Sequence, residues 1–384
     1  MTTVIDRQIK KIESIVDENT RVMEVQNFKK YRPLFELAYE FLKTKNVLLY
    51  GGTAINELLP AKLRFYSKEM LSDIDLYSYN AEKVAEQLHN AFKKKGHLST
   101  FKMGLHENTW KVMVDGVQVA DITSISKQAY MQLAKNGVMT AYGVRTVNPE
   151  YLRLSMHIIL SQPNDARLWS KTLWRLIAFY KAFPPKVKEC KGKPTNDIPK
   201  NLMMYIKAFI FANKYIILGM HQNVLVHDLY DGATGMINII VEQEPLDVAI
   251  VIANDWMDIQ IQGPYEDENV GQHVILESNG KPFMCIFRAT SCLSYVEHGP
   301  KKYRLASIHT LLRMYIGMMV SGMKHFDHSS LECVANVLAK EVVDSIDIGR
   351  HVKKAFALEC YGQYDGLYTM RRKQFMRKIN VPIN

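Results

Sequence analysis

The spacing of apolar residues changes several times along the chain, and each change marks a predicted element. From residue 5 onward isoleucines recur three and four positions apart, which is typical of one helix face, so we expect helix over residues 4–45. A polar stretch at residues 17–19 predicts a break, after which a second helical piece covers residues 28–42. An apolar strand at residues 47–50 follows directly and ends in two glycines.

Helical and alternating patterns continue through the rest of the chain. In order they predict helix 81–95, strands 109–114 and 117–125, helices 150–159, 165–183 and 202–218, strands 236–241, 246–253, 259–261, 273–276 and 283–287, and helices 305–323 and 331–344. Asp115 and Gly116 lie between two alternating runs, which is a strong signal for a hairpin turn. The sequence therefore predicts a mixed α/β protein.

One segment interrupts this pattern and suggests a domain boundary. Residues 184–200 hold four prolines and five lysines among few apolar positions, so we expect a linker or surface loop there. The predicted organisation is then N-terminal helices that pack on the following domain (1–46), a first α/β domain (47–183) and a second α/β domain (201–384).

Composition and charge narrow the class of protein. Hydrophobic residues make up 47% and charged residues 23% of the chain, as in ordinary folded proteins. The net charge of +10 at pH 7 favours a polyanionic partner such as nucleic acid. Five scattered cysteines without a CxxC pair indicate reduced thiols rather than disulfides or a zinc site. Without an apolar leader or a run of membrane length, the chain is predicted to be soluble, with no membrane contact.

The candidate chemistry begins with a pair of acids after the two glycines. Side chains alternate along a strand, so Asp73 and Asp75 are predicted to share one face. Two neighbouring carboxylates repel each other unless a cation lies between them, and hard oxygen ligands suit Mg²⁺. Gly51 and Gly52 lack a Cβ and precede a helix-like segment, so their backbone N–H groups can approach a phosphate closely. Asp121, on the strand 117–125, is the candidate third carboxylate for a site with two metal ions.

These features resemble a known family. Gly-Gly, then Asp-x-Asp, then a lone Asp on a later strand resembles the DNA polymerase β-like nucleotidyltransferase superfamily. Within it, GGTAIN, SDIDLYS and VQVADITSI look like the poly(A) polymerases of poxviruses and of the large DNA viruses related to mimivirus. The motifs span residues 48–126. Thr53, and the long segment between Gly52 and Asp73, depart from compact relatives that carry Gly-Ser.

The resemblance implies a nucleotidyltransferase palm, followed by a second α/β domain for which a degenerate copy of the first is one expectation. It implies a template-independent polymerase that adds AMP from ATP to the 3′ end of mRNA. Asp73 and Asp75 would hold two Mg²⁺ (or Mn²⁺) ions, and Asp121 would complete the site for one of them. The RNA 3′-hydroxyl would attack the α-phosphate, and pyrophosphate would leave beside the amides of Gly51 and Gly52.

Other residues are assigned by their place in the motifs or by charge. Thr53, Asn56 and Ser72 lie in the nucleotide-binding motifs, where they would contact phosphate, support the ligands or cap the helix. Three basic clusters are candidates for binding RNA phosphates: residues 186–193, a cluster represented by Lys301 and Lys302, and one represented by Arg371 and Arg372. In the second domain Asp247, Asp255 and Asp258 have no upstream Gly-Gly, so no metal site is expected there.

Partners and alternatives stay open at this point. The viral resemblance implies either a homodimer or a cap-methylating partner, and a location in the host cytoplasm, the virus factory or the virion. Another nucleotidyltransferase, acting on a small molecule, a protein or tRNA ends, would use the same acids. A non-catalytic RNA-binding subunit is the alternative from a different class, although three mutually repelling carboxylates argue against it.

Overall fold

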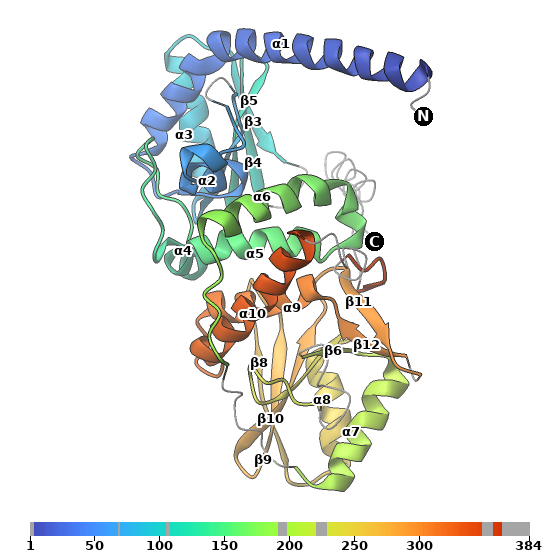
Figure 1. Cartoon of the computed structure of the whole chain (residues 1–384). Helices are drawn as coiled ribbons and strands as arrows, with labels where there is room; N and C mark the ends of the chain where they lie inside the picture. Colours follow the sequence, from blue (N-terminus) through green and yellow to red (C-terminus); the bar gives the residue numbers. More distant parts are fainter. Residues whose placement is uncertain are drawn as a thin grey trace, which may run out of the picture. The chain divides into compact units, whose positions relative to one another are not determined.

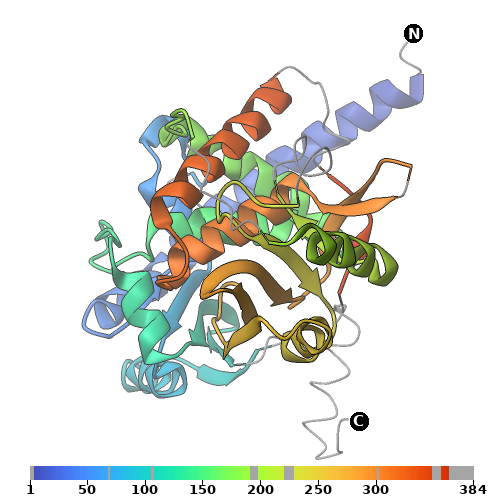
Figure 2. The same ribbon diagram turned by 90° about the horizontal axis from the view of Figure 1, so that it is seen from below.

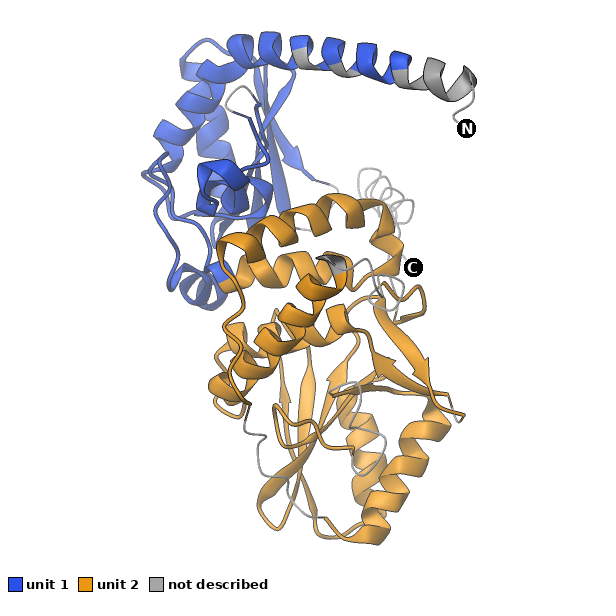
Figure 3. Ribbon diagram, in the orientation of Figure 1, with its two compact units in different colours: residues 1–149 blue, residues 150–384 orange. Residues whose placement is uncertain are grey.

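The computed structural model describes residues 4–67, 70–104, 108–190, 198–219, 229–300, 302–347 and 356–362. It divides into two compact units, residues 1–149 and 150–384, shown in different colours in Figure 3. The boundary between these units precedes the segment 184–200, which remains a predicted linker. Each unit is described by itself below.

Unit 1 begins with one long helix, α1 (Val4–Leu42), of 39 residues. The predicted break at residues 17–19 is therefore wrong. Asp, Glu and Asn cost a helix interior only tenths of a kcal/mol, and no glycine or proline stands there to interrupt it. The carboxyl-terminal part buries Leu34, Ala38 and Leu42 and packs against α3 (Ala81–Lys94).

The helix leads into a five-stranded sheet of order β1-β2-β5-β4-β3; Figure 1 labels β3, β4 and β5 of this sheet. The remaining elements of unit 1 are β1 (Leu48–Leu49), α2 (Gly51–Leu58), η1 (Ala61–Leu63), β2 (Ile74–Ser78), β3 (Ser99–Met103), β4 (Thr109–Val114), β5 (Val117–Ser124) and α4 (Lys127–Ala134). Strands β2 and β5 run parallel, and the other neighbours run antiparallel. The predicted hairpin at Asp115 and Gly116 is confirmed as β4–β5.

Unit 2 is built around an eight-stranded sheet of order β13-β11-β12-β6-β7-β10-β9-β8. Its elements are α5 (Pro149–Leu160), η2 (Pro163–Leu168), α6 (Trp169–Ala182), α7 (Lys200–Asn213), β6 (Ile216–Leu218), β7 (Ile237–Val241), α8 (Pro245–Asn254), β8 (Ile259–Tyr265), β9 (His273–Ser278), β10 (Lys281–Arg288), β11 (Leu293–His298), β12 (Tyr303–Ala306), α9 (Ile308–Ser321), α10 (His328–Asp347) and β13 (Cys360–Tyr361). Helix α8 packs against β8, β9 and β10, and α9 against β11 and β12 (Figure 1 and Figure 2).

Three predicted elements of unit 2 are corrected by the structure. The run 246–253, predicted as a strand, is helix α8, in which Val248, Ala249 and Ile252 are buried at helical spacing. The helix predicted over 202–218 ends at Asn213, because Lys214 turns to a left-handed φ of 53° and the chain continues as β6. The start predicted for helix 305–323 is strand β12 instead, and α9 follows it.

The sheet of unit 2 contains the topology of unit 1. The neighbours β6-β7-β10-β9-β8 have the same order and directions as β1-β2-β5-β4-β3, with one parallel pair, β7–β10, in the place of β2–β5. Helix α8 follows β7 as α3 follows β2. This correspondence supports the expectation that the second domain is a degenerate copy of the first.

The cysteines do not behave as the sequence predicted. Cys190 pairs with Cys333 and Cys292 with Cys360 as disulfides, and Cys285 is a buried free thiol. The partners are 143 and 68 residues apart, so only the tertiary fold brings them together. Among the described residues, no helix is long and apolar enough to cross a membrane.

Candidate active site

The parallel pair β2–β5 brings two of the predicted acids side by side. Asp75 and Asp121 are direct register partners, and both are partly buried. Ile74 and Leu76, on either side of Asp75, are fully buried in the core, so the acid lies on the opposite face of the strand. Asp73 stands just before the strand and is exposed. Asp75 is therefore next to Asp121 in the sheet, whereas Asp73 lies one residue before β2, and the shared face predicted for Asp73 and Asp75 stays a prediction.

The start of helix α2 is fitted against Asp75. Gly51 has a φ of +70°, and a Cβ built there would overlap Oδ2 of Asp75 and lie 3.1 Å from its Cγ. The backbone N–H of Tyr50 donates a hydrogen bond of 2.9 Å to the backbone carbonyl of Asp75. Only glycine allows this approach, because it has no Cβ and adopts a positive φ without strain. The start of helix α2 and strand β2 therefore pack directly against each other.

Thr53, Ser72 and Asn56 support the loop between the glycines and the acids. The hydroxyl of Thr53 donates to the backbone carbonyl of Asp73 at 2.9 Å and lies 2.7 Å from the Ser72 hydroxyl, whose proton it can accept. Oδ1 of Asn56 accepts hydrogen bonds of 3.0 Å from the amides of Phe65 and Tyr66. These contacts hold the chain that leads into β2.

Lys111 is the residue of the site that sequence reasoning missed. Its Nζ lies 2.6 Å from Oδ2 of Asp121 and 3.0 Å from Oε1 of Gln118. Lys111 and Asp121 are register partners on the antiparallel strands β4 and β5. The side chains of Lys111 and Asp121 are 27% and 16% exposed, so the ion pair is largely shielded from water.

The donor set fits a hard divalent cation. No group of three His, Cys, Asp or Glu side chains among the described residues is arranged to hold an ion as it stands, and at Asp121 the ammonium of Lys111 already takes one oxygen. The other carboxylate oxygen, Oδ1, is buried without a hydrogen-bond partner. A buried carboxylate oxygen without a donor is costly unless a cation reaches it. Carboxylate oxygens such as those of Asp75 and Asp121 suit Mg²⁺ or Mn²⁺.

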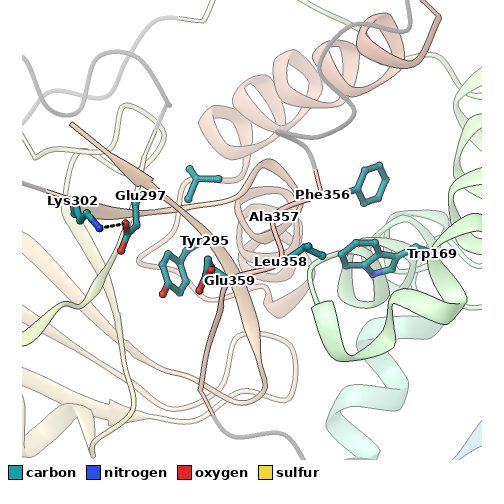
Figure 4. A pocket seen from close by; sticks show the side chains of 9 residues that line it. Trp169, Tyr295, Glu297, Lys302, Phe356, Ala357, Leu358 and Glu359 are labelled. Atoms are coloured by element: carbon teal, nitrogen blue, oxygen red, sulfur yellow. Dashed lines mark ion pairs between the residues drawn. The ribbon is translucent and has the colours of Figure 1, made fainter. Parts of the chain in front are cut away.

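The predicted RNA-binding residues are only partly described. Lys301, Arg371 and Arg372 lie outside the described residues. Lys302 is exposed and pairs with Glu297 at 3.4 Å. It lines a pocket of about 1010 Å³ in unit 2. The other side chains around this pocket, drawn in Figure 4, are Trp169, Tyr295, Val296, Glu297, Phe356, Ala357, Leu358 and Glu359.

The three acids of unit 2 that were considered in the sequence lie on or beside helix α8. Asp247 lies in the first turn of α8, Asp255 caps its carboxyl end, and Asp258 precedes β8. They are spread over one helix and the loop that follows it, and the expectation that they form no metal site stays a prediction.

The protein has a mixed α/β fold with two of the predicted acids on the parallel pair of its first sheet, an arrangement compatible with a nucleotidyltransferase fold. Residues 36–166 match the family model described as "Poly(A) polymerase catalytic subunit". Two relatives are each described as a "Putative poly(A) polymerase catalytic subunit". The one from African swine fever virus (isolate Pig/Kenya/KEN-50/1950) is 28% identical over 133 residues, 34% of this chain and 27% of the relative. The one from Acanthamoeba polyphaga mimivirus is 26% identical over 207 residues, 51% of this chain and 34% of the relative.

The fold has a solved counterpart. The crystal structure of the Megavirus polyadenylate synthase matches with a TM-score of 0.77 and 17% identity, covering 100% of this chain and 85% of the other. The resemblance to the viral poly(A) polymerases is thereby confirmed, and within the chain it centres on the segment that holds Asp73, Asp75 and Asp121. The aligned segments span only about a third or less of the two curated relatives.

Proposed function

We propose that this protein is a template-independent poly(A) polymerase that adds AMP from ATP to the 3′ end of RNA. The observation that carries the proposal is the register pairing of Asp75 with Asp121 beside Gly51. All three residues lie within the segment that matches the poly(A) polymerase family. A carboxylate pair next to the start of a helix is suited to a nucleoside triphosphate, whose phosphates need both cations and backbone donors.

Asp73, Asp75 and Asp121 would hold the divalent ions, Mg²⁺ or Mn²⁺. When bound, these ions supply charge stabilisation at the α-phosphate and at the leaving pyrophosphate. The protein contributes the positions of its carboxylates, which the sheet fixes through the alignment of β2 with β5. The Thr53 hydroxyl bond to the Asp73 carbonyl fixes the remaining acid, which precedes the strand.

The first amides of α2 would bind the triphosphate. The first N–H groups of a helix have no intrahelical acceptor and carry partial positive charge. Tyr50, the N-cap residue, makes no side-chain hydrogen bond to them. The amides of Gly51 and Gly52 can therefore donate to phosphate oxygens. In the reaction the RNA 3′-oxygen forms a bond to the α-phosphorus, and the bond to pyrophosphate breaks.

RNA would be held mainly through its phosphates. The net charge of +10 supplies the attraction, and we assign Lys301, Lys302, Arg371 and Arg372 to this surface. Assembly as a homodimer or with a cap-methylating partner, and a location in the host cytoplasm, virus factory or virion, belong to the same proposal.

A primer-extension assay tests the reaction. A 5′-labelled single-stranded RNA is incubated with Mg²⁺ and each of the four NTPs, and we expect extension with ATP. Asp75→Ala and Asp121→Ala should each lower the rate by about 10³-fold or more, because the ions lose a ligand. The matched control, Asp247→Asn combined with Asp258→Asn in unit 2, should keep near-normal turnover. Activity retained in both unit 1 variants would refute the assignment of the acids.

A further inference from the structure

The acidic cluster of unit 1 contains a cation of its own. The ammonium of Lys111 lies 2.6 Å from Oδ2 of Asp121, within strong hydrogen-bond distance, and both side chains are largely buried. Asp121 in turn stands beside Asp75 in the sheet. A lysine at this position offsets part of the repulsion between the carboxylates.

A β-bulge places the second partner of Lys111. In the β4–β5 ladder Val112 pairs with Ala120, whereas Met113 pairs with Gln118, so Val119 is an extra residue. Three positions separate Gln118 from Asp121, which in a regular strand would put them on opposite faces. The extra residue returns Gln118 to the face of Asp121. Its Oε1 there lies 3.0 Å from Nζ of Lys111. The ammonium is therefore held from two sides along the same strand.

The two oxygens of Asp121 are consequently not equivalent. Oδ2 is occupied by Lys111, and Oδ1 is buried without a hydrogen-bond partner. When one oxygen of a carboxylate is held by a hydrogen bond, the orientation of the carboxylate plane and the position of the second oxygen are fixed as well. Oδ1 of Asp121 is therefore the oxygen that is available to an ion shared with Asp75.

We propose that Lys111 is a positioning residue: it remains on Oδ2 of Asp121 and so presents Oδ1 to the divalent ion, while Gln118 keeps the ammonium in place. The proposal rests on the assignment of Asp75 and Asp121 as metal ligands. Hydrogen-bond partners that orient a metal ligand typically contribute 10- to 100-fold to metal affinity. The opposite effect is expected if Lys111 merely competes with the ion for Asp121, because removing its positive charge would then tighten metal binding.

Measuring Mn²⁺ affinity without ATP or RNA distinguishes a lysine that positions Asp121 from one that competes with the ion. Free Mn²⁺ is measured by electron paramagnetic resonance in titrations of the full-length protein, without ATP or RNA. Lys111→Met keeps much of the aliphatic stem and removes the charge, and we expect it to weaken Mn²⁺ binding by about 10- to 100-fold. Lys111→Arg, which keeps a donor, should fall between this variant and the wild type. Gln118→Ala should weaken binding less than Lys111→Met, because the lysine is still present.

The chain offers a matched control. Lys102 is the register partner of Lys111 on the next strand, β3, and its side chain is exposed. Lys102→Met removes the same charge from the same sheet, two strands away from Asp121, and should bind Mn²⁺ like the wild type. A melting curve of each metal-free variant shows whether it is folded. If Lys111→Met fails to fold, the Gln118→Ala comparison with wild type carries the test.

The outcomes separate this inference from the proposed function. If Asp121→Asn weakens Mn²⁺ binding while folded Lys111→Met binds as tightly as wild type, or more tightly, Lys111 is not a positioning residue and the metal site stands. If Asp121→Asn also binds Mn²⁺ normally, the metal site itself is misassigned. If Lys102→Met loses as much Mn²⁺ affinity as Lys111→Met, the effect comes from the net charge of the protein and not from the contact with Asp121, which would overturn the inference.

Discussion

Replacing Gly51 by alanine adds one methyl group at the contact between helix α2 and the acid strand. The new Cβ would overlap Oδ2 of Asp75 and lie 3.1 Å and 3.2 Å from its Cγ and Cβ. The side chain of Asp75 and the backbone at position 51 have to move apart to relieve this overlap. The movement shifts either the carboxylate of Asp75 or the amides that face the triphosphate, and both belong to the proposed site.

The expected size of the effect has two parts. An L-residue at a φ near +70° costs roughly 1–2 kcal/mol, and this part appears as lost stability. The second part is geometric, because a misplacement of about 1 Å in a reacting group can cost on the order of 10²-fold in rate. Gly51→Ala should therefore lower single-turnover AMP transfer by about 100-fold or more, while the protein remains folded.

Gly116 provides the matched control. It has a φ of +82° in the turn of the β4–β5 hairpin, and nothing lies within 4 Å of a Cβ built there. Gly116→Ala should show the same backbone strain, about 1–2 kcal/mol, with a transfer rate within about twofold of wild type. Thermal melting and single-turnover extension of a labelled RNA primer measure the two parts separately. Equal rates in the two variants would refute the reasoning, because the loss would then come from backbone strain alone.

Two further predictions concern RNA binding and unit 2. For single-stranded RNA, the slope of log K against log salt is about −0.7 per neutralised phosphate, so four contacts predict that affinity falls roughly fifty-fold between 50 and 200 mM salt. Lys301→Glu and Lys302→Glu should reduce this salt dependence. A flat salt response in fluorescence anisotropy would count against RNA as the acceptor. In unit 2 burial lowers the pKa of His309 to about 3, and the pKa of His157, 3.1 Å away between Nδ1 atoms, also lies well below its ordinary value. Unfolded histidines titrate near pH 6.5. Above about pH 6.5 both histidines are therefore neutral in the folded and the unfolded chain, and the free energy of unfolding has its full value. It falls by up to about 1.4 kcal/mol per pH unit per histidine as the pH decreases toward 3. Denaturant unfolding between pH 7 and 5 should show a smaller slope in His309→Gln than in the control at exposed His298, and equal slopes would contradict this.

Much of the acid site could be predicted because its signals are local. The alternation in β2, the turn residues of the β4–β5 hairpin and the glycines at the start of α2 are each set by a few neighbouring residues. The strands predicted at 109–114 and 117–125 accordingly agree with β4 and β5 to within one residue.

Lys111 could not be found in the same way. A regular two-residue hairpin around Asp115 and Gly116 would pair Lys111 with position 120, where the side chain points into the core. The bulge at Val119 shifts the register by one and brings Lys111 opposite Asp121. The apolar run of α8 was ambiguous for a related reason, since a short run of β-branched residues fits a buried strand or a buried helix equally well.

The two sheets share a topology but differ in the residues at matching positions. Asp75 is the second residue of β2 and pairs with Asp121, whereas the second residue of β7, Asn238, pairs with Cys285 of β10. Both Asn238 and Cys285 are fully buried, and Asn238 donates hydrogen bonds of 2.8 Å to Asp231 and Thr234. Carboxylates at Asn238 and Cys285 would therefore be two like charges inside a closed core, which costs far more than such a pair beside an opening. Unit 1 tolerates its acids because Asp73 is exposed and Asp75 only partly buried, and because Lys111 already pairs with the third. Access and a resident counter-charge, rather than strand order, thus distinguish the two sheets, and the metal site proposed for unit 1 depends on both features.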